Sequence, residues 1–118
     1  MASLIACLSS GKGTWAHVDR LINEQQWEKI FLVTNNFGIE NFKPKKPVEF
    51  VVIDENKFLP EITEEIRKQL KDKINDTEVA LNFISGNGKE HMALLSAVLK
   101  LGLGIRLIAL TPEGIKEI

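Results

Sequence analysis

The sequence predicts a single α/β domain over residues 1–118, built on a three-layer, Rossmann-like parallel sheet. Apolar runs of strand length alternate with amphipathic segments along the chain, which is typical of strand–helix–strand units. The run at 30–34 is apolar almost throughout, as expected for a strand buried on both faces of a parallel sheet. No linker, charge block or low-complexity segment divides the chain, so one domain accounts for its length.

The first half of the chain predicts two strands on either side of a helix. Residues 3–8 and 30–34 have the length and apolar character of strands. A helix is expected over 14–25, because its apolar residues fall on one face, and Thr14 is placed to cap it. Residues 35–47 contain a glycine and two prolines and are expected to form a loop with a single helical turn.

The second half predicts three strands and two helices. The strands are expected at 48–53, 79–84 and 105–110. A helix that starts near Pro60 has one apolar residue per turn on an otherwise charged surface, namely Ile62, Ile66, Leu70 and Ile74. The last helix is expected over 90–101, and Gly102 is suited to end it.

The order of these elements also predicts their arrangement in space. Right-handed crossovers between parallel strands favour the strand order 3-2-1-4-5. In that order the chain reverses direction between the first and fourth strands, and ligands of such folds bind in the crevice beyond the carboxyl ends of those strands. The segments that follow these two strands should therefore flank one pocket.

Both of those segments are glycine-rich turns of nearly the same sequence. Ser10–Thr14 reads Ser-Gly-Lys-Gly-Thr, and Ser85–Lys89 reads Ser-Gly-Asn-Gly-Lys. Such a turn exposes backbone N–H groups at a helix N-terminus, where the helix dipole favours an anion such as phosphate. The candidate ligand-binding residues in and beside the turns are Ser9, Ser10, Gly11, Lys12, Gly13, Thr14, Ser85, Gly86, Asn87, Gly88 and Lys89.

The same residues also have a purely structural interpretation. Glycines are common in strand–helix turns because they permit positive φ, and serines often cap helices. Lys12 and Lys89 could simply be solvated. Of the two histidines, His17 is expected to face solvent on its helix, and His91 is the better candidate for a titratable group in the pocket.

Composition narrows the classes of function. Fifteen basic and sixteen acidic residues give a net charge of −1, so we do not expect the domain to bind duplex DNA directly. The apolar runs are too short to span a membrane, and no secretory signal is evident. A single cysteine excludes an internal disulfide and fits a cytoplasmic protein. The scattered Cys7, His17 and His91 offer no zinc spacing, so neither a metal nor a resident cofactor is expected.

The helix expected over 90–101 is apolar on more than the one face that a sheet requires. We therefore expect a two-fold homodimer that buries Leu94, Ala97 or Leu101. The alternative is that residues 113–118 fold over the second apolar face of this helix.

A dinucleotide site is one alternative for the first turn. Residues 11–16 match the G-x-G-x-x-[GA] pattern that follows a strand in NAD-binding domains. That pattern also requires an acidic residue at the end of the second strand, where this chain has Thr34, Asn35 and Asn36. No Walker A spacing is present.

Two segments carry a resemblance to a known family. Asn82 within an apolar strand, followed by Ser85–Met92, resembles the fourth-strand segment of the CRISPR-associated Rossmann-fold (CARF) family, which has an Asn, a Ser/Thr-Gly turn, a Lys and then a Met. Leu8–Gly11 resembles the family's other ligand loop. Members of this family normally dimerise around a cyclic oligoadenylate, and some cleave it. The family's usual effector domain is absent from residues 1–118.

The resemblance implies a homodimeric module that senses or slowly cleaves a cyclic oligoadenylate, with Asn82 among its ligand-binding residues. In the cleaving version, Ser10 or Ser9 would position the reacting 2′-hydroxyl or phosphate, and Lys89 would stabilise the developing charge. No general base is evident, so turnover should be slow. The alternatives are an NAD(P)- or nucleotide-dependent enzyme, or a structural or regulatory subunit whose two turns are vestigial.

Overall fold

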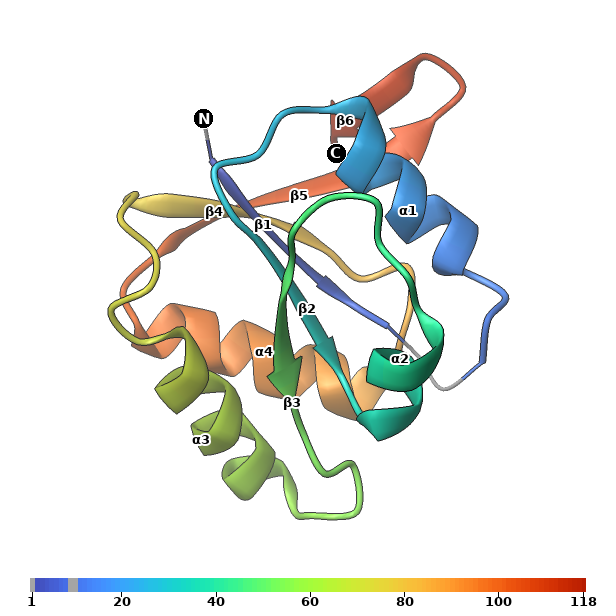
Figure 1. Ribbon diagram of the computed structural model, residues 1–118. Helices are drawn as coiled ribbons and strands as arrows, with labels where there is room; N and C mark the ends of the chain where they lie inside the picture. Colours follow the sequence, from blue (N-terminus) through green and yellow to red (C-terminus); the bar gives the residue numbers. More distant parts are fainter. Residues whose placement is uncertain (1, 9–10) are drawn as a thin grey trace.

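The computed structural model describes residues 2–8 and 11–118 and confirms the α/β class (Figure 1). The six strands form one sheet in the order β3-β2-β1-β4-β5-β6. The predicted order 3-2-1-4-5 is therefore confirmed, with one further strand at its end. In chain order the elements are β1 (Ser3–Cys7), α1 (Trp15–Glu24), β2 (Ile30–Thr34), α2 (Asn36–Asn41), β3 (Glu49–Val52), α3 (Leu59–Leu70), β4 (Glu78–Asn82), α4 (Gly88–Lys100), β5 (Gly104–Thr111) and β6 (Gly114–Glu117).

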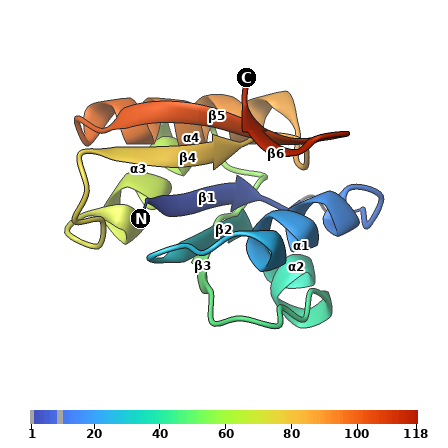
Figure 2. The same cartoon turned by 90° about the horizontal axis from the view of Figure 1, so that it is seen from above.

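Helices cover both faces of the sheet, which gives the predicted three layers. Figures 1 and 2 show α3 and α4 beside each other and apart from α1. Alternate residues of β1 point to opposite faces, so that Ile5 packs in the cluster with α3 and α4, while Leu4 packs in the cluster with α1. Every residue of β1 and β2 is buried, as expected for central strands of a parallel sheet.

Helix α4 packs on the sheet with the side that was expected to form the dimer interface. Leu94 and Ala97 have no exposed surface and belong to the core on the sheet, and Leu101 packs against the same core. The prediction that a partner chain buries Leu94 or Ala97 is therefore wrong, because the protein's own core buries both, and Leu101 is already partly covered by the same core. The helix is apolar on two sides, and the sequence pattern alone does not say which side meets the sheet.

The other apolar side of α4 is exposed. Met92 is 62%, Leu99 is 59% and Leu95 is 36% exposed. Residues 113–118 do not cover this face, because β6 pairs antiparallel with β5 and Ile115 packs in the cluster that contains α1. We call Met92, Leu95 and Leu99 the exposed α4 face.

Several element ends differ from the predictions for local reasons. Thr14 is at the N-cap position of α1, but its side chain makes no capping hydrogen bond, so that prediction is wrong. Helix α4 begins two residues earlier than expected, at Gly88, because Asn87 caps it. It ends at Lys100, and the φ of 76° at Gly102 then allows Leu103 N–H to donate to Val98 O over 3.4 Å.

The outer edge of β3 is closed by a side chain of α3. The amide of Gln69 accepts from Val52 N over 3.0 Å and donates to Val52 O over 2.8 Å. It thereby takes the place of a neighbouring strand at this residue.

Candidate functional site

The two glycine turns follow strands that are neighbours in the sheet, β1 and β4. The strands pair in parallel, with Ala6 opposite Asn82, so both carboxyl ends reach the same edge of the sheet. A Cβ built on Gly86 would lie 3.1 Å from Cys7 Cβ, which shows how closely the second turn approaches the end of β1. The predicted adjacency of the turns' parent strands is thus confirmed.

The glycines of the two turns do not have the same role. Gly86 has a φ of 99°, and an added Cβ would also lie 2.9 Å from Glu90 Oε1, so this position requires glycine. Among the described residues, no atom lies within 4 Å of a Cβ built on Gly11, Gly13 or Gly88. Glycine at these three positions is not demanded by packing and leaves the backbone open to close approach.

The described part of the first turn carries a lysine next to an aromatic ring. Lys12 Nζ lies 5.8 Å from the centre of the Trp15 ring, within the range of a cation–π contact. In residues 2–8 and 11–118, the backbone N–H groups of Gly13 and Thr14 have no acceptor. Ser9 and Ser10, two of the predicted site residues, lie outside the described residues.

The second turn is fixed by the helix that it starts. The Asn87 side chain accepts from Glu90 N, and Glu90 Oε1 accepts from Asn87 N, both over 2.9 Å, which forms a capping box. Burial raises the pKa of the Glu90 carboxyl, opposed by the hydrogen bond from Asn87, and the nearby charge of Glu55 raises it further.

His91 contacts the backbone of the second turn. Its Nε2 lies 2.8 Å from the carbonyl oxygen of the buried Ser85, and because a carbonyl only accepts, Nε2 is the protonated nitrogen. Its ring also stacks on Phe83 with centroids 4.9 Å apart. These contacts give His91 a positioning role in the turn.

Lys89 lies on the exposed first turn of α4 and points to another strand. Its Nζ donates to the carbonyl oxygen of Glu55 over 3.0 Å. The contact joins the start of α4 to the segment after β3, so the carboxyl ends of β3 and β4 are connected through one side chain.

The amide of Asn82 is used within the protein. Asn82 is buried; its Nδ2 donates to Ile108 O over 2.8 Å and its Oδ1 accepts from Ile84 N over 3.2 Å. It ties β4 to β5 and fixes the start of the second turn. These contacts place its side chain beneath the turn as a support for it.

His17 does not face solvent as expected. It is half-buried, and its Nε2 lies 3.3 Å from both Leu110 N and Asn82 Nδ2. Both partners are donors, so Nε2 is the unprotonated acceptor of a neutral ring. Burial lowers the pKa of His17, and the Arg20 charge lowers it further. The sequence pattern gives the position of His17 around the axis of α1, but it does not show that β5 lies beside that side of the helix.

A second group of polar residues lies at the carboxyl ends of β2 and β3 and was not foreseen. Asn35 Nδ2 donates to both carboxylate oxygens of Glu55, over 3.0 and 3.1 Å, and its Oδ1 accepts from Gly38 N. The two residues line a cavity of about 510 Å³. An Asn at the end of a strand was the available signal, and it was interpreted only as a missing acid.

Comparisons with known proteins add no assignment: no protein-family model matches the chain, and no curated protein matches it. Among residues 2–8 and 11–118, no group of three His, Cys, Asp or Glu side chains could hold a metal ion. Within the same residues, none of the helices combines the length and the apolar character that crossing a membrane would need. The site must therefore be interpreted from its own geometry.

Gly86→Ala tests the close approach of the second turn to β1. We expect it to lower the free energy of unfolding by about 1–2 kcal/mol, because the left-handed backbone disfavours a side chain and the new Cβ overlaps Glu90. Gly88→Ala is the control, since it begins α4 in open space and should be neutral or slightly stabilising. Urea unfolding measures both, and equal stabilities would contradict the described turn.

The lowered pKa of His17 predicts a pH dependence of stability. The unfolded chain takes up a proton near the ordinary value of 6.5, whereas the folded protein resists it. The stabilisation is therefore complete above that value and is lost as the pH falls through the lower folded pKa. His17→Gln, which keeps an acceptor, should flatten this part of the pH profile of urea unfolding. An unchanged profile would show that His17 is not the group responsible.

Proposed function

We propose that the protein is a homodimeric module that binds a phosphate-bearing nucleotide at the carboxyl ends of β1 and β4. The observation that carries the proposal is the parallel pairing of these two strands, which sets both glycine turns at one edge of the sheet. That edge is the switch point of the strand order, where α/β folds of this kind bind ligands.

The chemistry of the turns supports an anionic ligand. Lys12 contributes a positive charge beside Trp15, and the N–H groups of Gly13 and Thr14 have no acceptor among the described residues. Lys89 is exposed on the first turn of α4, where it could exchange its contact with a carbonyl for one with phosphate. Glycines that packing does not require allow a ligand to reach the backbone.

The resemblance of both turns to the ligand loops of the CARF family makes a cyclic oligoadenylate the nucleotide that we propose. A two-fold ligand of this kind fits a two-fold dimer. In the cleaving version, Ser10 or Ser9 would position the reacting 2′-hydroxyl or phosphate, and Lys89 would stabilise the developing charge.

A thermal-shift comparison tests the proposal, because a ligand that binds only the native state raises the unfolding midpoint. The ligands are cyclic oligoadenylates, mononucleotides, ATP and NAD. We expect the cyclic oligoadenylate to give the largest shift; a shift with NAD alone would favour the dinucleotide alternative, and no shift with any ligand would leave the turns purely structural. Incubation with the wild type, followed by chromatography, then separates sensing from cleavage.

Removing either lysine should weaken the proposed complex. We expect Lys89→Ala and Lys12→Ala each to cost about 1–3 kcal/mol of binding, through the loss of a charge-assisted hydrogen bond. Both side chains are exposed, so the free energy of unfolding should barely change. Lys71→Ala is the matched control, because Lys71 follows α3 at the opposite end of the sheet. Isothermal titration measures the affinities, and equal losses in all three variants would contradict a local role.

The exposed α4 face is the surface that we propose for the dimer. Three large apolar side chains on one helix form a continuous patch with the neighbouring Ser96 and Lys100, and such patches mark interaction sites. We propose this face in place of the interface through Leu94, Ala97 or Leu101 that the sequence predicted.

Sedimentation velocity at micromolar concentrations should therefore show a dimer of the wild type. Leu95→Glu combined with Leu99→Glu should give a folded monomer, because it places charges in an apolar interface. Ala16→Glu, on the exposed side of α1, is the control and should remain dimeric. A wild-type monomer would contradict this part of the proposal.

A further inference from the structure

The cavity at the carboxyl ends of β2 and β3 has the size and chemistry of a small-molecule site. Its volume is about 510 Å³, within the usual range for such sites. Its lining combines carboxylates, amides and one aromatic ring, which include Asn36, Phe37, Glu55, Asn56 and Glu65.

Glu55 is held by two side chains, one on its carboxylate and one on its backbone. Asn35 Nδ2 binds both of its oxygens, and Lys89 Nζ binds the carbonyl oxygen of the same residue. Asn35 is itself held, because its Oδ1 accepts from Gly38 N over 3.1 Å. A carboxylate fixed in this way keeps lone pairs available and loses little conformational freedom on binding a ligand.

Hydroxyl groups are the ligand chemistry that suits this cavity. Its carboxylates repel phosphate, and Glu65 is already paired with Lys57 over 3.3 Å, which reduces the attraction for an amine. Among the described residues no metal cluster occurs. Carboxylates at the end of the second strand of α/β nucleotide-binding domains accept hydrogen bonds from ribose hydroxyls. Here Asn35 directly follows the second strand, and its amide holds the carboxylate of Glu55 beside the end of that strand.

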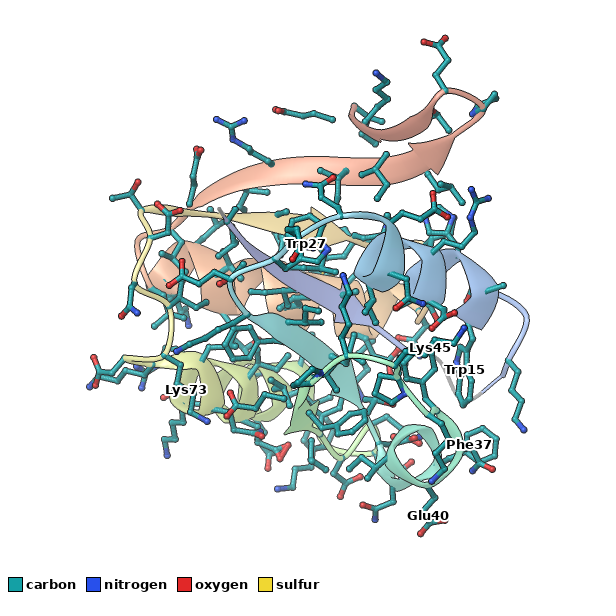
Figure 3. All side chains as sticks on the ribbon, turned by 45° about the horizontal axis from the view of Figure 1, so that its top comes forward. Trp15, Trp27, Phe37, Glu40, Lys45 and Lys73 are labelled. Carbon is teal, nitrogen blue, oxygen red and sulfur yellow. The ribbon has the colours of Figure 1, made fainter. Side chains whose placement is uncertain are left out.

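An aromatic contact connects the cavity with the first glycine turn. Phe37 lines the cavity and is 39% exposed. Its ring lies 5.9 Å from that of Trp15 (Figure 3). The Trp15 ring in turn has Lys12 Nζ 5.8 Å from its centre. The acidic cavity and the cationic turn are thus joined by two adjacent rings, one of which offers a face to a base.

We infer that this cavity holds the ribose of a ribonucleotide, with Phe37 beside the base and Glu55 accepting hydrogen bonds from the free ribose hydroxyls. These are the 2′- and 3′-hydroxyls of adenosine, and the 2′-hydroxyl alone where the 3′-oxygen is esterified in a cyclic oligoadenylate. The inference rests on the proposed function for the position of the phosphate, which would lie toward Lys12. It assigns Asn35 as a positioning residue and Glu55 as a ligand-binding residue.

Titration with adenosine, which carries no phosphate, tests the ribose site apart from the phosphate site. NMR of the wild type should show shifts at residues 35–37 and 54–56. With 2′,3′-dideoxyadenosine the affinity should fall about tenfold or more, because the carboxylate is then left without its hydrogen-bond donors. This comparison needs no variant and so does not depend on the folding of a mutant.

Glu55→Gln should cause a comparable loss of affinity for adenosine, while the Asn35 amide can still donate to the new side chain. Glu40→Gln is the control: it removes the same charge from α2 at an exposed residue that points away from the molecule in Figure 3. Lys12→Ala, which removes the charge of the proposed phosphate site and has no contact with Glu55, should leave adenosine binding unchanged.

The outcomes separate the two proposals. Binding of adenosine that requires Glu55, together with no gain of affinity for AMP or a cyclic oligoadenylate over adenosine, would support the ribose site and refute the proposed function. Binding of AMP with shifts only in the glycine turns and no loss in Glu55→Gln would refute the ribose site and leave the proposed function standing. Equal affinities for adenosine and its dideoxy analogue would also overturn the inference. So would binding of the polyamine spermidine without binding of adenosine, because the cavity would then be a site for amines.

Discussion

The parallel pairing of β1 with β4 is the constraint on which the rest of the structure depends. It joins the two halves of the chain, since the units before and after it extend the sheet in opposite directions. It also brings the end of β1 against Gly86, where only a glycine fits. The helices that follow the two strands lie on opposite faces of the sheet, so the direction of the chain after each strand decides where the two turns lie, as much as individual side chains do.

Asparagines fix the backbone at three places along this edge of the sheet. The Oδ1 atoms of Asn35, Asn82 and Asn87 accept from the backbone N–H of Gly38, Ile84 and Glu90. Each therefore supports a turn or helix start directly after a strand or loop. The segments at this edge are held before any ligand arrives, which lowers the entropy that binding must overcome.

The sequence predicted most of the fold because the signals were local and repeated. Apolar runs and helical stripes located five strands and three of the four helices, and crossover handedness supplied their order. It missed β6, because Gly114–Glu117 is short and mixed in polarity, and an edge strand needs only one covered side. It also misjudged which apolar side of α4 meets the sheet, since that choice depends on the packing of Leu94 and Ala97 in three dimensions.

The candidate site was predictable only where its residues are close in sequence. The two glycine turns were recognised, whereas the contact of Asn35 with Glu55 joins residues twenty positions apart. The acceptor role of His17 depends on Leu110, ninety-three positions away. A sequence pattern has no access to such contacts, because they arise from the register of strands that are not consecutive.

The Gln69 side chain on β3 has a consequence for self-association. It occupies the backbone N–H and carbonyl of Val52 on one outer strand, and the opposite outer strand, β6, is only four residues long with exposed Lys116 and Glu117. Edge strands that are short, charged or covered discourage edge-to-edge pairing with the sheet of another molecule. Both outer strands therefore carry a feature that opposes the growth of a continuous sheet between molecules, whereas the described helical surfaces carry none of this kind.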